Sequence, residues 1–150
     1  MNISVSSDTD EPVTHLLVRE LERRGHHVLP HGTLKAGDRT DWAFASQAAA
    51  QDVASGRAEQ AVVCCWTGTG AALAANKVRG VRAALCGDAY TAAGARRWND
   101  ANVLALSLRL VSGPLLTEIL DAWFGAEASD VPEDTRNIAH IGRIEEREQG

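Results

Sequence analysis

The residues of this chain that are best suited to do chemistry surround one thiol and one glycine loop. Residues 62–70 read Val-Val-Cys-Cys-Trp-Thr-Gly-Thr-Gly, and an alanine-rich run ending in Asn76-Lys77 follows at once. This pattern predicts a buried strand with Cys65 at its carboxyl end, a loop with exposed backbone N–H groups, and a helix whose start carries a positive partial charge. A thiolate facing such an oxyanion cradle suits removal of a proton next to a carbonyl, with the enediolate held by the loop.

Ordinary packing is the alternative explanation of the same residues. Cysteine is among the most buried residue types, and a Gly-x-Gly loop after a strand is common in α/β proteins that bind any anion or none. Because side chains alternate along a strand, Cys64 points away from Cys65 and is expected in the core. Cys65 is the candidate base, since loop amides and a helix start stabilise a thiolate.

Length, charge and cysteine content exclude several classes of protein. The 150 residues are enough for a single domain, 1–150, with a sizeable core. The formal net charge of −5 argues against nonspecific nucleic-acid binding, and no apolar run approaches the length of a membrane span. Three cysteines, two of them adjacent, make a poor disulfide framework, and the first residues lack the charged region and cleavage site of a signal peptide. We therefore expect a cytoplasmic protein.

The elements that must position the thiol follow a regular order. Strand patterns occur at 3–6, 26–29, 61–65, 81–85 and 103–106, and helical patterns at 15–24, 43–54, 71–78, 89–97 and 115–124. Pro30 is expected to close the second strand and to leave His31 in a turn. This alternation predicts an α/β protein with a three-layer doubly wound fold, a five-stranded parallel sheet and a C-terminal helical tail. The tail, 126–150, is too short to be a domain, so we expect it to pack on a partner subunit.

Ligands of such sheets bind beyond the carboxyl ends of the strands. Four of the predicted strands end in groups that could converge on one pocket there: Asp8, Cys65-Trp66-Thr67, Gly87-Asp88 and Ser107-Leu108-Arg109. The histidines have no carboxylate or thiol at metal-ligand spacing, so we expect no metal site.

Segments over nearly the whole chain carry a family resemblance. They are Ser7-Asp8, Arg39 to Trp42, the Cys-x-Thr-Gly-x-Gly loop joined to Ala74-Ala75-Asn76-Lys77, Gly80 to Ala84, Asn99 to Leu106, and Asp121 to Trp123. Together they resemble ribose-5-phosphate isomerase B and the related galactose-6-phosphate isomerase subunits. The resemblance implies a cytosolic aldose–ketose isomerase of a sugar phosphate that uses no metal or other cofactor. It also implies a homodimer, or alternatively a tetramer, whose active sites combine residues of two subunits.

The resemblance extends to individual residues. Cys65 resembles the catalytic base that moves a proton between C1 and C2, and Thr67 resembles the hydroxyl that assists at the sugar. The implied substrate-binding residues are Asp8 for the sugar hydroxyls, the loop residues Trp66, Gly68, Thr69 and Gly70, the aromatic Trp42, the groups Asn99 and Arg109 that cross the dimer interface, and Arg136 and His140 for the phosphate.

Three positions depart from the family pattern. Thr9 replaces a histidine that helps to hold phosphate in the family, and Trp66 replaces a glycine. Trp98 replaces a histidine that opens the furanose ring in the family. Thr9 and Trp98 remain candidates for substrate binding. Indoles narrow a pocket and stack on sugars, and loss of an imidazole removes an acid–base group. A tetrose 4-phosphate needs no ring opener, because its esterified O4 cannot close a five-membered ring. Two alternatives stay open: Trp98 stacks on a different pentose or hexose, or it only packs.

Three other functions compete with this interpretation. One is an isomerase of a non-phosphorylated or longer sugar. Another is a non-catalytic subunit that binds sugar phosphate, which Thr9 and Trp98 favour but Cys65 and Thr67 do not. The third is a nucleotide-binding module, against which the missing Gly-x-Gly-x-x-Gly pattern and ribose-binding acid argue.

Overall fold

The computed structural model describes residues 1–148. Within them, five strands alternate with helices, and a further helix ends the described chain. The strands are β1 (Asn2–Ser7), β2 (His27–Gly32), β3 (Gln60–Cys65), β4 (Ala83–Leu85) and β5 (Val103–Ser107). The helices are α1 (Pro12–Arg23), α2 (Trp42–Ala54), α3 (Thr69–Asn76), α4 (Ala89–Asn99), α5 (Gly113–Gly125) and α6 (Pro132–Glu148).

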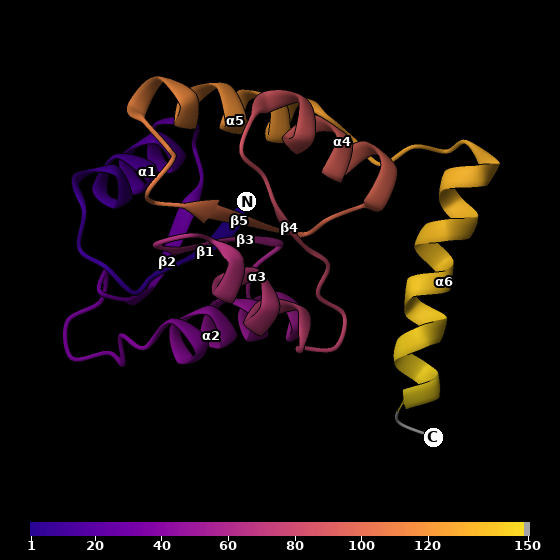
Figure 1. Cartoon of the computed structure of the whole chain (residues 1–150), viewed down its shortest axis with the longest axis horizontal. Helices are drawn as coiled ribbons and strands as arrows, with labels where there is room; N and C mark the ends of the chain where they lie inside the picture. Colours follow the sequence, from indigo (N-terminus) through magenta and orange to yellow (C-terminus); the bar gives the residue numbers. More distant parts are fainter. Residues whose placement is uncertain (149–150) are drawn as a thin grey trace.

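The strands form one parallel sheet in the order β2-β1-β3-β5-β4. Helices α1, α4 and α5 cover one face, and α2 and α3 cover the other (Figure 1). Connections from β1 to β2 and from β4 to β5 run in one direction along the sheet and use the first face. The connections from β2 to β3 and from β3 to β4 run in the opposite direction and use the second face. This arrangement is expected when all crossovers between parallel strands have the same handedness. The predicted three-layer fold with a five-stranded parallel sheet is confirmed.

The two faces of the sheet are packed with side chains of different size. Large apolar residues fill the face under α1, α4 and α5, among them Leu17, Leu104, Ile119, Leu120 and Trp123. The face under α2 and α3 is built largely from alanine and valine, including Ala49, Ala61, Val63, Ala71 and Ala75. Small side chains let α2 and α3 approach the sheet closely. The short loop 66–68 places the start of α3 close to the end of β3. Cys64 belongs to the first core and Cys65 to the second, as strand alternation predicts.

The edge strand β2 differs from its prediction. It continues through Pro30 to Gly32, so His31 lies in the strand and not in a turn. A proline is tolerated here because β2 has a neighbour on one side only, with Pro30 opposite Val5 of β1.

A buried carboxylate ties β2 to the rest of this face. Asp52 of α2 is 4% exposed, and its Oδ2 accepts hydrogen bonds from Ser4 Oγ at 2.7 Å and from His31 Nε2 at 2.7 Å. Arg57 reaches its other oxygen at 3.2 Å. Burial is the largest single influence and acts to raise the pKa of Asp52. The hydrogen bonds from Ser4 and His31, together with the positive charges of His31 and Arg57, outweigh it and hold that pKa below its ordinary value.

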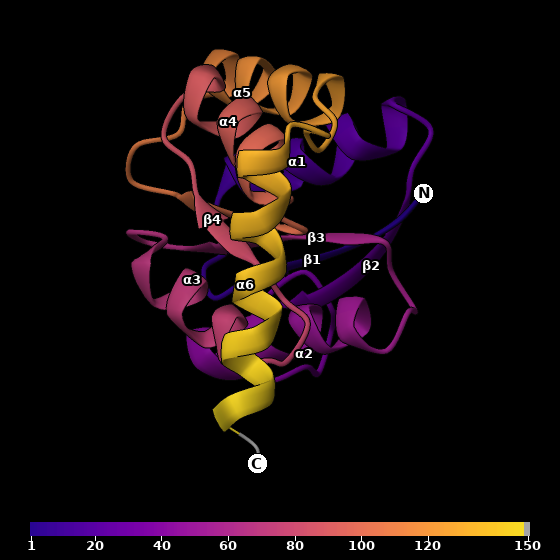
Figure 2. The same ribbon diagram turned by 90° about the vertical axis from the view of Figure 1, so that its right-hand side faces the viewer.

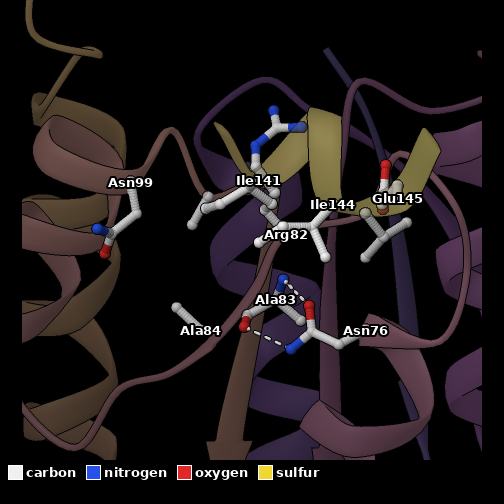
Figure 3. A pocket seen from close by; sticks show the side chains of 10 residues that line it. Asn76, Arg82, Ala83, Ala84, Asn99, Ile141, Ile144 and Glu145 are labelled. Atoms are coloured by element: carbon white, nitrogen blue, oxygen red, sulfur yellow. Dashed lines mark hydrogen bonds between the residues drawn. The ribbon is translucent and has the colours of Figure 1, made fainter. Parts of the chain in front are cut away.

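The side chain of Asn76 and helix α6 cover the opposite edge of the sheet, which is β4. Figure 3 shows the Asn76 amide facing the backbone of Ala83, where it donates to the carbonyl at 2.9 Å and accepts from the N–H at 2.8 Å. Helix α6 crosses this edge from the layer of α4 towards the layer of α2 (Figure 2). Its contact is sparse: Glu145 accepts from the Gly80 N–H at 3.0 Å, and a pocket of about 320 Å³ remains between α6 and β4. No helix of residues 1–148 combines the length and apolar character that crossing a membrane requires.

Candidate active site

The β3–α3 loop places a thiol against the start of a helix. Cys65 ends β3, is 5% exposed, and its Sγ accepts a hydrogen bond from the Ala71 N–H at 3.4 Å. Gly68 makes the tight turn with a φ of +76°. A Cβ there would lie 2.5 Å from Leu85 Cδ1 and 2.9 Å from the carbonyl carbon of Leu106, so only glycine fits this turn.

The same turn presents backbone donors. The Ala72 N–H bonds to the Gly68 carbonyl at 3.1 Å, so the N–H groups of Thr69 and Gly70 precede the first intrahelical hydrogen bond. The hydroxyls of Thr67 and Thr69 lie 2.8 Å apart and both side chains are exposed. Free N–H groups and hydroxyls at a helix start make a site for an oxyanion.

The end of β5 holds the loop from one side. The Leu108 N–H donates to the Cys65 carbonyl at 3.0 Å, and the Arg109 N–H donates to the Trp66 carbonyl at 2.9 Å. The Ser107 hydroxyl also donates to the Trp66 carbonyl, at 3.0 Å. Arg109 is therefore brought to the loop within one chain, with its side chain exposed. Ser107 was expected near the pocket as a residue that ends a strand, but the sequence assigned it no specific role in the site.

The end of β1 approaches the loop from the other side. Ser7 pairs with Cys64 in the sheet register, and half-buried Asp8 and Thr9 follow at the same edge. The Thr9 hydroxyl donates to Asp8 Oδ1 at 2.9 Å. The Ser7 hydroxyl donates to the Thr9 carbonyl at 2.7 Å and accepts from the Thr9 N–H at 3.2 Å, so this short turn is fixed.

Two indoles border the loop. Trp42, the first residue of α2, lies against α3, because a Cβ on Gly70 would come within 2.8 Å of its ring. Trp66 follows Cys65 directly. Trp42 is 47% exposed and Trp66 is 50% exposed, so both present apolar surface beside the donors.

Trp98 and Asn99 lie at the far end of α4. This helix begins beyond the carboxyl end of β4 and returns to the amino edge of the sheet, so its last residues are carried away from Cys65. Trp98 covers Gly94, meets Tyr90 edge-on with ring centroids 6.0 Å apart, and remains 41% exposed. Asn99 lines the pocket between β4 and α6 (Figure 3).

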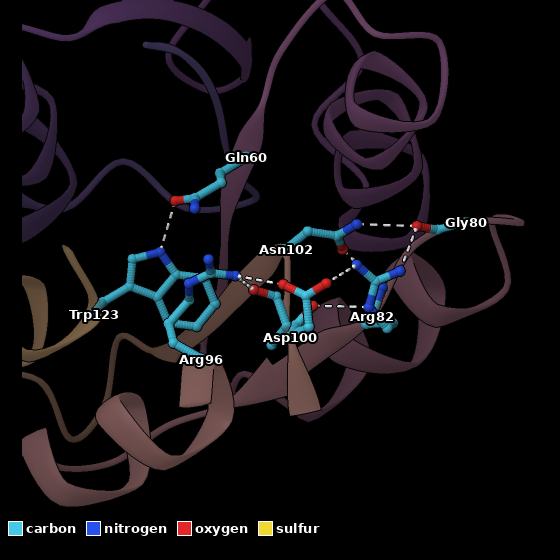
Figure 4. Close-up of polar contacts among 8 residues, drawn as sticks. Gln60, Gly80, Arg82, Arg96, Asp100, Asn102 and Trp123 are labelled. Carbon is cyan, nitrogen blue, oxygen red and sulfur yellow. Dashed lines mark hydrogen bonds and ion pairs between the residues drawn. The ribbon is translucent and has the colours of Figure 1, made fainter. Parts of the chain in front are cut away.

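A charged cluster fixes this end of α4 (Figure 4). Asp100 takes the left-handed conformation with a φ of +47°. Its carboxylate contacts Arg82 at 3.2 Å and Arg96 at 3.3 Å. Arg96 also lies over the ring of Trp123, whose Nε1 donates to Gln60 at 2.9 Å. These ion pairs fix the chain directly after Asn99, so Asn99 does not lie at a free helix end.

The predicted phosphate ligands lie on α6. Arg136 and His140 are exposed, and among residues 1–148 no hydrogen bond or ion pair ties either side chain to the sheet. A single chain therefore brings together the predicted site residues Asp8, Thr9, Trp42, Cys65 to Gly70 and Arg109, but not Trp98, Asn99, Arg136 and His140.

The three thiols differ in their surroundings. Burial raises the pKa of Cys64 far above its ordinary value, and it raises the pKa of Cys86 to about 11. Cys65 alone accepts a backbone N–H at a helix start. Within residues 1–148, no group of three or more His, Cys, Asp or Glu side chains is arranged to hold a metal ion.

Comparison with known proteins identifies the family. The model of the family described as Ribose/Galactose Isomerase matches residues 3–141. Ribose-5-phosphate isomerase B of Escherichia coli is 38% identical over 133 residues, which cover 89% of this chain and 88% of that protein. D-erythrulose-4-phosphate isomerase of Pectobacterium atrosepticum is 30% identical over 128 residues, covering 85% and 84%. The structure of ribose-5-phosphate isomerase B from Clostridium thermocellum matches with a TM-score of 0.88 at 34% identity, covering 98% of this chain and 99% of that one. The chain thus belongs to the ribose/galactose isomerase family.

Proposed function

We propose that this chain is a cytoplasmic, cofactor-independent aldose–ketose isomerase of a small sugar phosphate, with Cys65 as its base. The observation that carries this proposal is the contact between Cys65 Sγ and the Ala71 N–H, at a helix start where the N–H groups of Thr69 and Gly70 precede the first intrahelical hydrogen bond. A hydrogen bond from a backbone N–H at a helix start stabilises a thiolate.

The reaction is a proton transfer between neighbouring carbons. The Cys65 thiolate removes the C2 proton of the aldose, and the carbonyl oxygen on C1 becomes the oxyanion of a cis-enediolate. The backbone N–H groups of residues 67–70 stabilise that charge, and the Thr67 hydroxyl assists. The thiol then returns its proton to C1 while the O2 proton passes to O1, which leaves the ketose and the original thiolate.

A four-carbon sugar phosphate is the substrate class that we favour. Trp66 directly follows the base in the chain and is 50% exposed, and Trp98 supplies no imidazole for ring opening. Neither residue hinders a substrate that is short and already open. A relative that covers most of this chain carries the name D-erythrulose-4-phosphate isomerase, which supports the same class.

A second copy of the chain completes the site in this proposal. In one chain the loop lacks the predicted phosphate ligands Arg136 and His140, and most residues of α6 are exposed. Apolar side chains also stand exposed near this edge, including Tyr90 at 77% and Ile144 at 49%. The tail 126–150, of which the last two residues lie outside the described part, then packs on the partner, while 1–150 forms a single domain.

The base is tested by two matched cysteine variants. Tetrose, pentose and hexose substrates, with and without phosphate, are assayed for turnover and for exchange of the transferred proton with deuterium. Cys65→Ala should lose about a hundredfold to ten-thousandfold in turnover, as general-base loss does, whereas Cys64→Ala should keep most activity. Near-normal turnover by Cys65→Ala would remove the assignment. Binding without turnover by the unaltered protein would indicate a non-catalytic subunit instead.

The substrate class is tested in the same panel. D-erythrulose 4-phosphate should have a higher kcat/KM than ribose 5-phosphate, and Trp98→His should help ribose 5-phosphate more than the tetrose. A clear preference of the unaltered protein for ribose 5-phosphate would refute the four-carbon assignment.

Shared sites are tested by mixing two inactive variants. In a mixed dimer of Cys65→Ala and Arg136→Ala, one site would combine an intact thiol with an intact arginine from the other chain. Activity should therefore return on mixing. If the mixture stays as inactive as its parts, the tail does not act across subunits.

A further inference from the structure

Ser107 is a buried serine that hydrogen-bonds the active-site loop and has no part in the reaction proposed above. It ends β5, is 8% exposed, and its hydroxyl donates to the Trp66 carbonyl at 3.0 Å. We propose that Ser107 is a positioning residue, which aims the Thr67 N–H at the oxyanion of the enediolate. This inference rests on the proposed isomerase function.

Two donors converge on one carbonyl. The Trp66 carbonyl accepts both the Ser107 hydroxyl and the Arg109 N–H, the latter at 2.9 Å. Together they fix the peptide plane that joins Trp66 to Thr67. This peptide is trans, as are the other peptide bonds of the described chain, so its C=O and N–H point in opposite directions.

The direction of the Thr67 N–H follows from the strand order. Strand β3 lies between β1 and β5, and both donors to the Trp66 carbonyl come from the β5 side. The Thr67 N–H therefore points towards the β1 side, where Asp8 and Thr9 follow the strand. The gap between β1 and β3 is also where the connections of the sheet diverge, which is the place where ligands bind in open parallel sheets.

The chemical effect is confined to the charged state. A donor that is held in place before the reaction stabilises the enediolate oxyanion without reorganising. The same donor stabilises the neutral hydroxyl or carbonyl of the bound substrate only slightly. Loss of the Ser107 anchor should therefore lower kcat and leave KM almost unchanged.

The test compares three serine variants. Ser107→Ala removes the anchor, and Ser107→Thr restores a hydroxyl at a strand end that tolerates β-branched residues. Ser6→Ala is the matched control, because Ser6 is a fully buried strand serine whose hydroxyl has no hydrogen-bond partner within the described residues. Removing a whole oxyanion donor costs about a hundredfold to a thousandfold, so removing one of two anchors should lower kcat by about threefold to thirtyfold.

A pair of ligands separates positioning from general loss of structure. Erythritol 4-phosphate has no enediolate oxyanion, whereas a hydroxamate in which N–OH replaces C1–OH of the four-carbon enediol phosphate mimics that group. Ser107→Ala should weaken binding of the hydroxamate and leave that of erythritol 4-phosphate unchanged, and Ser107→Thr should recover both kcat and hydroxamate affinity. Equal weakening of the two ligands, or a kcat equal to that of Ser6→Ala, would overturn the inference.

The binding measurement needs no turnover. A chain that binds both ligands but isomerises no sugar in the panel would refute the proposed function and still decide the role of Ser107. Binding of neither ligand would refute both.

Discussion

Replacing Gly68 by alanine should damage both stability and turnover, and the structure gives the size of the effect. The φ of +76° puts an alanine in the left-handed region, which costs about 1–2 kcal/mol. The added Cβ would lie 2.5 Å from Leu85 Cδ1, a flexible and partly exposed side chain that can move aside. It would also lie 2.9 Å from the carbonyl carbon of Leu106, in a strand that is hydrogen-bonded on both sides and cannot yield easily.

The steric contact with Leu106 adds to the free-energy cost of the left-handed backbone conformation. Overpacking of a filled site costs about 1–3 kcal/mol, so Gly68→Ala should lose about 2–5 kcal/mol in its free energy of unfolding. Gly56→Ala is the matched control: its φ is +82°, and a Cβ there meets nothing within 4 Å. This variant should lose only the backbone term, about 1–2 kcal/mol.

Urea unfolding of both variants, followed by circular dichroism, measures the difference directly. Turnover should fall in Gly68→Ala, because the donors of residues 67–70 shift with the turn, and should stay normal in Gly56→Ala. Equal urea midpoints for the two variants would show that the contact with Leu106 carries no cost and would refute the reasoning.

Three further predictions concern stability and thiol reactivity. Asp52→Asn should lose less stability than the unaltered protein as the pH falls from about 6 to about 3. A carboxylate whose pKa is lowered in the folded state stabilises the fold above its unfolded-state pKa, and this stabilisation is lost as the pH falls through its folded-state pKa. Equal changes in urea midpoint for the two proteins between these pH values would contradict this. Trp123→Phe should cost about 2 kcal/mol in urea unfolding, because it removes the donor to Gln60 and part of a buried ring, and an unchanged midpoint would count against that hydrogen bond. Cys86, whose pKa burial raises to about 11, should react with iodoacetamide far more slowly in the folded than in the unfolded protein at about pH 8, as mass spectrometry would detect; equal rates would contradict its burial.

The sheet and one half of the site could be predicted from the sequence. Apolar runs that alternate with helical patterns define the strands, and parallel strands bring their carboxyl ends to one edge. Asp8, Cys65 and Arg109 were therefore expected together, and the structure brings them together. The continuation of β2 through Pro30 was not predictable in this way, because it depends on β2 being an edge strand, which is a property of strand order.

The rest of the predicted site could not be assembled from strand patterns. Trp98 and Asn99 end α4, and a helix that follows a strand returns to the opposite edge of the sheet, away from Cys65. Arg136 and His140 belong to a helix that covers the β4 edge. Their roles came from resemblance alone. The distance of these groups from Cys65 depends on how α4 and α6 are placed in space, and no local spacing of residues expresses it.

The Asn76 amide has a consequence for solubility. An unpaired strand edge is a template on which other chains can add strands and aggregate. The outward-facing backbone groups of Ala83 are already occupied by Asn76, which imitates the hydrogen bonds of a neighbouring strand. At Ala83, a single side chain therefore hinders the addition of another strand to the β4 edge. This protection is built into the single chain.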